Sequence, residues 1–359
     1  MAKKVKKMGS QISLVKGLDM GTAFIYSAQK VGPEVSFKTL RDCFFDIERS
    51  DFIEEILKKS NVRYALKGER IYIVGEEAMK FANVFGKNTR RPLRNGVISP
   101  EEEESLPVIE LLIKDILGSP RSLERQRRGE MNEVHRTNKE VVCYSVPANP
   151  IDTTFDIVYH QNIIRMFLEN LGYQAKPLNE GLAVIYSELA RNNFTGLGIS
   201  LGGGMTNVCF AVMAVPIFSF SIARAGDWID EQVARVTNET MSKITAIKEA
   251  NLNLNLAETS TDKIDQALYI YYNSLIGYVL EKIKEEMEKG PRPRLEKPVP
   301  IVIAGGTAKP KGFQRMFEES LKKIQLPLEI GEVKLASHPL LSTVKGTLIA
   351  GIAESKKSA

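Results

Sequence analysis

Apolar residues along the chain follow two patterns, which predict strands and helices in alternation. Short runs rich in β-branched and aromatic residues predict strands within 12–31, 71–75, 141–148, 197–215 and 299–304. Apolar residues that recur at spacings of three and four predict helices over 106–117, 151–171, 227–236, 241–250 and 262–289. Gly290 and Pro291 end the last of these, and 338–355 predicts a closing helix. This order indicates two α/β lobes, with the closing helix returning to the first.

A glycine turn joins two strand-like runs within residues 12–31, which predicts a hairpin. Gly21 is expected to supply the unusual backbone angle of that turn. The same pattern recurs at 197–215, where Gly17 aligns with Gly198 and Gly21 with Gly202. The two halves of the chain therefore resemble each other as a divergent internal duplication.

Length and composition fit two domains of an intracellular protein. The chain has 359 residues, of which 43% are hydrophobic, and a single core stops growing near roughly 250 to 300 residues. Its three cysteines are odd in number and lack paired spacing, so we expect free, buried thiols. Its three histidines have no cysteine or acid at ligand spacing, which argues against a zinc site or a Ser/His/Asp hydrolase.

Charge is concentrated near the start of the chain. The net charge is +5, and five lysines precede the first acid, Asp19: Lys3, Lys4, Lys6, Lys7 and Lys16. A basic tail can touch anionic lipid or nucleic acid, but we favour a disordered, solubilising end. A second basic stretch, 121–136, is interpreted as a solvated loop. No run approaches the ~20 apolar residues of a membrane span, and the start lacks the apolar stretch of a signal peptide.

Three glycine turns carry the candidate chemistry, because consecutive backbone N–H groups without side chains can surround a phosphate. The turn 17–22 adds Asp19, which is placed to hold Mg²⁺ through water. The turn 202–206 offers a facing cradle, and 305–308 lets backbone approach an adenine or ribose. Neither a GxxxxGK[ST] nor a GxGxxG motif is present, so this is neither a P-loop nor a Rossmann turn.

Several motifs make the chain similar to a known superfamily. GLDMGT (17–22) resembles the first phosphate motif of the actin, heat-shock-chaperone and sugar-kinase ATPases, LGGGMTN (201–207) their second, and IVIAGGTAKPKGF (301–313) their adenosine motif. SVPAN (145–149) and NEGLAVIYS (179–187) are similar to the connecting segment. VGEEA (74–78) followed by RRPLRNGVI (90–98) is more discriminating, and resembles bacterial actins of the MreB and MamK type.

The resemblance implies an α/β fold of the actin-like (RNase H-like) class, in which two lobes each contain a mixed β-sheet flanked by helices. A nucleotide is expected in the cleft between the lobes. Residues 12–178 with 337–359 would form the first lobe, with an outer subdomain at about 36–78. Residues 179–336 would form the second, with a reduced outer subdomain at about 227–261.

The resemblance also implies roles for individual residues. Asp19 would position Mg²⁺ through water, with Ser200 as a second candidate, and Glu180 would orient the attacking water. From the residues alone the role of Glu180 stays open, because an acid at a helix start can act on water but also complements the helix dipole. The expected nucleotide-binding residues are Gly21, Thr22, Ala23, Gly202, Gly203, Gly204, Met205, Thr206, Lys248, Gly305, Gly306 and Thr307.

The chain departs from the family pattern at three polar positions and in one segment. Ser200 stands where the second motif normally has aspartate, Asn207 where another acid is common, and Thr245 where relatives often have an acid. Losing a carboxylate leaves the backbone cradle intact, so nucleotide binding should outlast hydrolysis. The segment 248–262 is shorter than the family's usual insertion, and the alternation at 251–256 predicts either an edge strand or a loop.

Two functions follow as hypotheses. The first is an actin-like cytoskeletal protein that binds ATP or ADP with Mg²⁺, polymerises in a nucleotide-dependent way and hydrolyses ATP slowly. Its partners would be other copies of itself, with a membrane surface or cytoskeletal proteins as further candidates and no nucleic acid. It would lie in the cytoplasm, with the inner face of the membrane as a candidate location. The alternative is a non-polymerising nucleotide-binding scaffold or adaptor. A chaperone or a sugar kinase shares the fold, but we find no substrate domain or polar substrate pocket for either.

Overall fold

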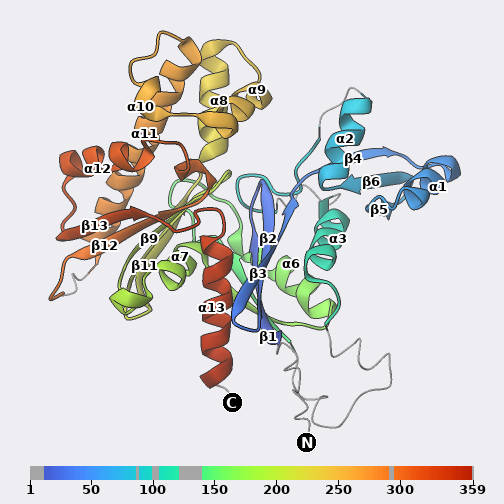
Figure 1. Ribbon diagram of the computed structural model, residues 1–359, viewed down its shortest axis with the longest axis horizontal. Coiled ribbons are helices and arrows are strands. Elements are labelled where there is room, and N and C mark those ends of the chain that lie inside the picture. Colours follow the sequence, from blue (N-terminus) through green and yellow to red (C-terminus); the bar gives the residue numbers. More distant parts are fainter. Residues whose placement is uncertain (1–11, 86–88, 99–104, 121–139, 291–294, 358–359) are drawn as a thin grey trace, which may run out of the picture.

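Two five-stranded sheets form the centre of the molecule (Figure 1). The computed structural model describes residues 12–85, 89–98, 105–120, 140–290 and 295–357. The basic stretch 121–136 and the lysines before residue 12 lie outside these ranges. Among the helices that the structure describes, none has both the length and the apolar character to span a bilayer.

The first sheet combines an antiparallel meander with two parallel strands. Its strands lie in the order β3 (Glu34–Arg41), β2 (Phe24–Val31), β1 (Ile12–Met20), β7 (Val141–Val146) and β8 (Gln174–Asn179). Strands β1, β2 and β3 pair antiparallel, whereas β7 is parallel to both β1 and β8. Helix α6 (Ile157–Asn170) connects the parallel pair β7 and β8, as a parallel connection requires.

The second sheet repeats this topology. Its strands lie in the order β11 (Val215–Ile222), β10 (Thr206–Val212), β9 (Gly196–Leu201), β12 (Val299–Ala304) and β13 (Ile330–Leu335). Three strands again form an antiparallel meander, and β12 is parallel to both β9 and β13. The shared strand order agrees with the internal duplication that the glycine turns predict.

Helices α7 (Glu180–Glu188) and α13 (Ser342–Lys357) lie between the two sheets (Figure 1). Val344 and Leu348 of α13 pack against Val15 of β1, so the closing helix does return to the first sheet. A Cβ on Gly346 would lie 1.8 Å from the carbonyl oxygen of Ala183, so α13 also packs directly on the backbone of α7.

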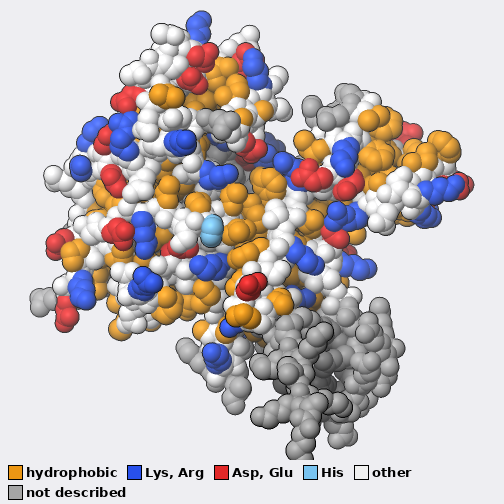
Figure 2. All heavy atoms as spheres, in the orientation of Figure 1, with side chains coloured by type: hydrophobic (Ala, Val, Ile, Leu, Met, Phe, Trp, Pro, Cys, Tyr) orange, Lys and Arg blue, Asp and Glu red, His pale blue; other side chains and the backbone are white. Residues whose placement is uncertain are grey.

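Smaller parts extend from both sheets toward the same side (Figure 1). On the first they are the sheet β4 (Phe44–Glu48), β6 (Arg70–Val74) and β5 (Tyr64–Lys67), with α1 (Asp51–Lys59) and α2 (Glu76–Val84). Helix α3 (Leu106–Leu117) packs on the first five-stranded sheet itself. On the second they are α8 (Gly226–Thr237), α9 (Met241–Asn251) and α10 (Leu254–Ala257). Figure 2 shows a notch between the two extensions, with acidic and basic side chains together at its base.

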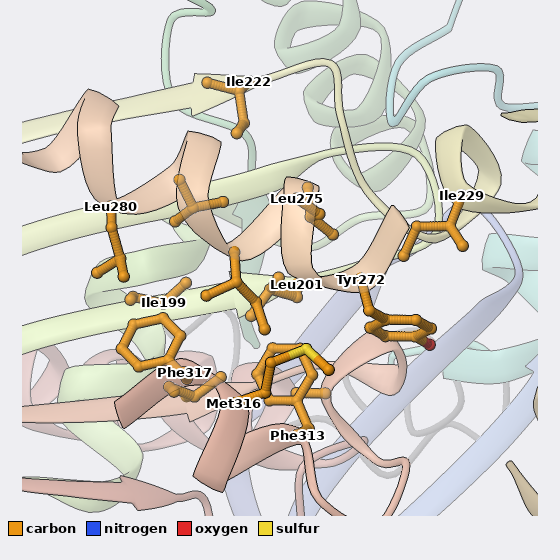
Figure 3. Close-up of a cluster of buried hydrophobic side chains, with 14 of the residues drawn as sticks. Ile199, Leu201, Ile222, Ile229, Tyr272, Leu275, Leu280, Phe313, Met316 and Phe317 are labelled. Carbon is orange, nitrogen blue, oxygen red and sulfur yellow. The ribbon is translucent and has the colours of Figure 1, made fainter. Parts of the chain in front are cut away.

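One face of the second sheet is covered by α11 (Lys263–Lys289) and α12 (Phe313–Ile324). Figure 3 shows Ile199 and Leu201 of β9 among the side chains of these helices, including Leu275 and Phe317. Because successive side chains of a strand point to opposite faces, Ser200 faces the other way, toward α7. The side chain of Ser200 therefore points into the interior of the molecule, between the two sheets.

The three cysteines agree with the prediction from sequence. Cys43, Cys143 and Cys209 are buried and free. Within the described ranges, no group of three or more His, Cys, Asp or Glu side chains could hold a metal ion by itself.

Four details differ from the sequence predictions. Helix α6 begins at Ile157, since Asp156 caps it and the N–H of Ile151 donates to the distant carbonyl of Ser221. Residues 251–256 form neither a strand nor a plain loop, because Asn253 caps the one-turn helix α10.

Lys16 does not belong to the basic tail. It is 8% exposed, and its Nζ donates to the carbonyl of Leu117 and the hydroxyl of Tyr173. The fourth difference concerns Gly21, which is absent from the glycines with positive φ. Its N–H donates to the carbonyl of Phe24, and a Cβ would lie 2.7 Å from that oxygen, so the turn needs glycine for room rather than for its angle.

Candidate functional site

The three glycine turns meet around one cavity of about 640 Å³. Every residue expected to bind nucleotide or metal lines it, except Thr206. The hydroxyl of Thr206 is fully buried in β10 and donates to the carbonyl of Arg224. The lining residues among those expected are Asp19, Gly21, Thr22, Ala23, Glu180, Ser200, Gly202, Gly203, Gly204, Met205, Lys248, Gly305, Gly306 and Thr307.

The second turn is held in place by its carbonyl groups. The carbonyl of Gly202 accepts hydrogen bonds from the N–H of Gly226 and from the hydroxyl of Thr307 in the third turn. The carbonyl of Gly203 accepts from the N–H of Asp227, at the start of α8. The N–H groups of Gly203 and Gly204 donate to no group in the described part of the chain. The turn thus has free donors of the kind that bind phosphate oxygens.

The two lobes touch where this turn meets the segment 89–98. A Cβ on Gly204 would lie 2.3 Å from the backbone nitrogen of Gly96 and 2.6 Å from Oγ1 of Thr22. Gly96 has a φ of 77° and packs against the side chain of Met205. His160 supports the segment from behind, since its Nδ1 accepts from the N–H of Ile98. The bacterial-actin-like stretch of the sequence therefore forms one wall of the cavity.

Two carboxyl groups and two serines form an oxygen-rich cluster at the ends of β1 and β9. The hydroxyl of Ser145 donates to Oδ1 of Asp19 over 2.6 Å, and that of Ser200 donates to Oε2 of Glu180 over 3.2 Å. Glu180 is the first residue of α7, capped by Asn179. The helix start that the sequence predicts at Glu180 is therefore confirmed.

Both acids of this cluster hold their protons unusually well. Burial raises the pKa of Asp19 to about 6, although its hydrogen bond from Ser145 acts in the opposite direction. Burial also raises the pKa of Glu180 to about 8, and the nearby charge of Asp19 raises it further. The cluster therefore favours a cation, because removing both protons leaves two negative charges close together.

A buried ion pair forms another wall. Nζ of Lys248 lies 2.7 Å from Oδ1 of Asp230 and donates to the carbonyl of Gly226, and the hydroxyl of Thr245 donates to Oδ2 of Asp230. Tyr272 of α11 also lines this wall, at the edge of the cluster in Figure 3. Lys248 and Thr245 were singled out from the sequence, whereas Asp230 was not.

Six charged residues of the cavity lining are not among the site residues that the sequence predicts: Arg91, Asp227, Asp230, Glu249, Lys309 and Lys311. Nη1 of Arg91 donates to both carboxylate oxygens of Asp227, at 3.0 and 3.1 Å. Asp227 and Asp230 follow Gly226 at a spacing of three on one helical face, a signal that could have marked them. Acids in the first turn of a helix also commonly complement the helix dipole, so the spacing alone does not indicate a site.

Two lobes of matching topology around glycine turns define an actin-like protein, as predicted. The chain belongs to the Volactin family, since the sequence model of that family matches residues 14–351. A search of the curated proteins found no match.

Solved structures share the fold at low sequence identity. The chain is similar to the MamK double helical filament, with 16% identity, 95% of this chain and 98% of that chain covered, and a TM-score of 0.65. MreB5 of Spiroplasma citri bound to AMPPNP gives 16% identity, coverages of 96% and 97%, and a TM-score of 0.62. The ethanolamine utilization protein EutJ from Carboxydothermus hydrogenoformans is 13% identical, with 96% of this chain and 92% of that chain covered and a TM-score of 0.53.

Proposed function

We propose that this protein binds ATP or ADP with Mg²⁺ between its lobes, assembles with copies of itself into nucleotide-dependent filaments, and hydrolyses ATP slowly. The observation that carries the proposal is the convergence of three glycine turns, Asp19 and Glu180 on one cavity. In this proposal residues 12–178 with 337–359 move as one lobe and residues 179–336 as the other.

The cavity has the size and donors for a nucleotide. Its volume of about 640 Å³ lies within the range of roughly 300 to 1,000 Å³ that small-molecule sites occupy. The free N–H groups of Gly203 and Gly204 would bind phosphate oxygens. The solved MreB5 of Spiroplasma citri was bound to AMPPNP in one structure and to ADP in another, which supports the same ligand class here.

The residues present also fit Mg²⁺. Asp19 supplies a buried carboxylate, which its neighbour Ser145 orients, and Glu180 and Ser200 add oxygen atoms nearby. Mg²⁺ typically uses one or two carboxylates, several waters and substrate phosphates. When bound, the ion would neutralise the charge of the phosphates and lower the pKa of the acids beside it.

The same cluster explains why hydrolysis should be slow. With a pKa of about 8, the carboxyl group of Glu180 is mostly protonated at neutral pH and cannot accept a proton from water. Ser200 offers a hydroxyl where a second carboxylate would add negative charge to hold metal and water. The rate of hydrolysis then depends on how far the bound ligand lowers the pKa of Glu180.

Self-assembly is supported by the fold. The solved MamK structure is a double helical filament, and its fold covers 95% of this chain. Other copies of the chain are therefore the proposed partners, with a membrane surface or cytoskeletal proteins as further ones. We place the protein in the cytoplasm, with the inner face of the membrane as an additional location.

A second candidate is a nucleotide-binding scaffold that does not polymerise. The contact between Ser200 and Glu180 favours it, because this arrangement weakens hydrolysis without disturbing the turns.

One experiment separates the two candidates. Sedimentation and phosphate release are measured together with Mg-ATP, Mg-AMPPNP, Mg-ADP and no nucleotide, for the wild type and Glu180→Ala. Pelleting with Mg-ATP or Mg-AMPPNP, together with slow phosphate release that Glu180→Ala abolishes, supports the filament proposal. Tight binding by persistent monomers supports the scaffold, and no binding of any nucleotide overturns both.

A further inference from the structure

Arg91 places a partly used guanidinium group inside the cavity. Its side chain is 36% exposed, and Nη1 donates to both carboxylate oxygens of Asp227. Its Nε and Nη2 groups donate to no group that the structure describes. A guanidinium has five N–H donors in a planar fork, so the edge that Asp227 leaves unused can bind a second planar or tetrahedral oxyanion.

The position of Arg91 is held from both lobes. Asp227 belongs to α8, whereas Asp42 follows β3 in the first half of the chain. Asp42 is fully buried, and neither of its carboxylate oxygens has a hydrogen-bond partner within the described ranges. Burial raises the pKa of Asp42 well above its ordinary value, and Arg91 acts against that rise. Glu249 of α9 is a further acid that acts on Arg91. The guanidinium therefore has acids of both halves of the chain near it, and Asp227 is the one that is hydrogen-bonded to it.

Arg91 is also close to the second glycine turn. The N–H of Asp227 donates to the carbonyl of Gly203 over 2.8 Å, and a Cβ on Gly203 would lie 3.6 Å from Oδ1 of Asp227. The carboxylate that holds Arg91 is thus in contact with the turn whose N–H groups are free. Guanidinium and turn donors border the same space.

The other cations of the cavity are less suited to this role. Lys248 is committed to Asp230 and to the carbonyl of Gly226. Lys309 and Lys311 line the cavity but are exposed to solvent. Arg91 is therefore the cation that combines partial burial with unused donors beside the turn.

We propose that Arg91 is a phosphate-binding residue, whose free donors bind the phosphate group held by the N–H groups of Gly203 and Gly204. Asp227 acts as a positioning residue that keeps the guanidinium fork turned toward that phosphate. The inference rests on the proposed function and names a further residue of its site. Because Arg91 and the turn come from different halves of the chain, one phosphate joins the two lobes.

The test compares ligands with and without phosphates. Calorimetry gives the affinities of ATP, ADP and adenosine, in the presence of Mg²⁺, for the wild type, Arg91→Ala, Arg91→Lys and Arg94→Ala. Loss of a charge-assisted contact is expected to weaken ATP binding of Arg91→Ala about 10- to 100-fold. Adenosine binding should not change. Arg91→Lys should recover part of the loss, since lysine keeps the charge but not the fork.

Arg94→Ala is the matched control. Arg94 lies in the same segment with an exposed side chain outside the cavity lining, so its removal should leave all affinities unchanged. Circular dichroism verifies folding, and Arg91→Lys keeps a cation beside Asp42 if Arg91→Ala unfolds.

Three results would overturn the inference. They are an unchanged ATP affinity in Arg91→Ala, an equal loss for ATP and adenosine, and a full recovery by lysine. The proposed function would survive all three, because the wild type would still bind ATP. A wild type that binds no nucleotide would overturn the proposed function and this inference together.

Discussion

The hydroxyl of Ser200 donates a hydrogen bond to Oε2 of Glu180 over 3.2 Å, so the residue found where the family pattern is expected to have a carboxylate touches the acid expected to orient water. Ser200 is 3% exposed, at the end of β9, and Glu180 begins α7. An acid at position 200 would therefore put two carboxyl groups in contact, in a site that already raises the pKa of Glu180.

Ser200→Asp is expected to lower the stability of the ligand-free protein and to raise the rate of ATP hydrolysis. Without ligand, the added carboxylate should lower the free energy of unfolding by about 1 to 3 kcal/mol, because it is buried beside a second acid. With Mg-ATP, the extra negative charge should strengthen metal binding and raise the rate of phosphate release. Urea unfolding and a phosphate-release assay measure the two effects. Ser200→Asn, which adds no charge, should not raise the rate. A folded Ser200→Asp with unchanged turnover would contradict the role given to the missing carboxylate.

The stability of the ligand-free protein should fall as pH rises from 6 to 8. The pKa of Glu180 is raised from 4.5 to about 8 in the folded state, so the native protein binds more protons than the unfolded chain in this range. The stabilisation is complete below about pH 4.5 and is lost as the pH rises through 8, by roughly 1 to 4 kcal/mol.

Glu180→Gln should flatten this pH dependence, because glutamine does not titrate. Urea unfolding at pH 6, 7 and 8 measures it, and Glu188→Gln serves as a control whose pKa is shifted the other way. The same slope in wild type and Glu180→Gln would show that another group is responsible.

Gly204→Ala should weaken nucleotide binding about 10-fold. That change in affinity corresponds to about 1.4 kcal/mol, which is within the usual cost of forcing an extra methyl group into a packed site. The added Cβ would lie 2.3 Å from the backbone nitrogen of Gly96 and 2.6 Å from Oγ1 of Thr22, which forces the second turn away from the first lobe. Calorimetry with ATP measures the change.

The control for this variant is Gly277→Ala. A Cβ on Gly277 meets nothing within 4 Å, and the residue lies inside α11. Alanine there should leave affinity unchanged and stabilise the protein by about 0.5 to 1 kcal/mol. Unchanged ATP affinity in Gly204→Ala would mean that the two lobes separate at this point when ligand binds.

Lys248→Met is expected to lower the free energy of unfolding by about 3 to 5 kcal/mol, because it leaves the carboxylate of Asp230 buried without its cation. The two side chains are 10% and 1% exposed and 2.7 Å apart. The double variant Lys248→Met/Asp230→Asn should recover most of the loss. Urea unfolding of the wild type and these variants measures the interaction energy between Lys248 and Asp230. Lys59→Met, which breaks the exposed pair with Glu55, should cost less than about 0.5 kcal/mol. A double variant as unstable as Lys248→Met would rule out the unpaired charge as the cause.

Local patterns in the sequence predicted most of the elements and the three turns. Helix α3 spans Leu106–Leu117 as predicted, and α11 begins directly after its predicted first residue, Asp262, which caps it. In both cases the apolar spacing and the residues at the helix ends act within a few positions, so neighbours along the chain contain the information. The glycine turns are visible for the same reason.

Contacts between distant parts of the chain decided the rest. Helix α6 starts late because Ile151 is hydrogen-bonded to Ser221, and Lys16 can be buried because Leu117 and Tyr173 accept hydrogen bonds from its Nζ. Arg91 and Asp227, 136 positions apart, are brought together only by the tertiary fold. By itself the sequence determined which backbone segments could hold a phosphate, because a turn is a local structure. Which charges lie beside those segments was decided by tertiary packing, because partners such as Arg91 and Asp227 come from different halves of the chain.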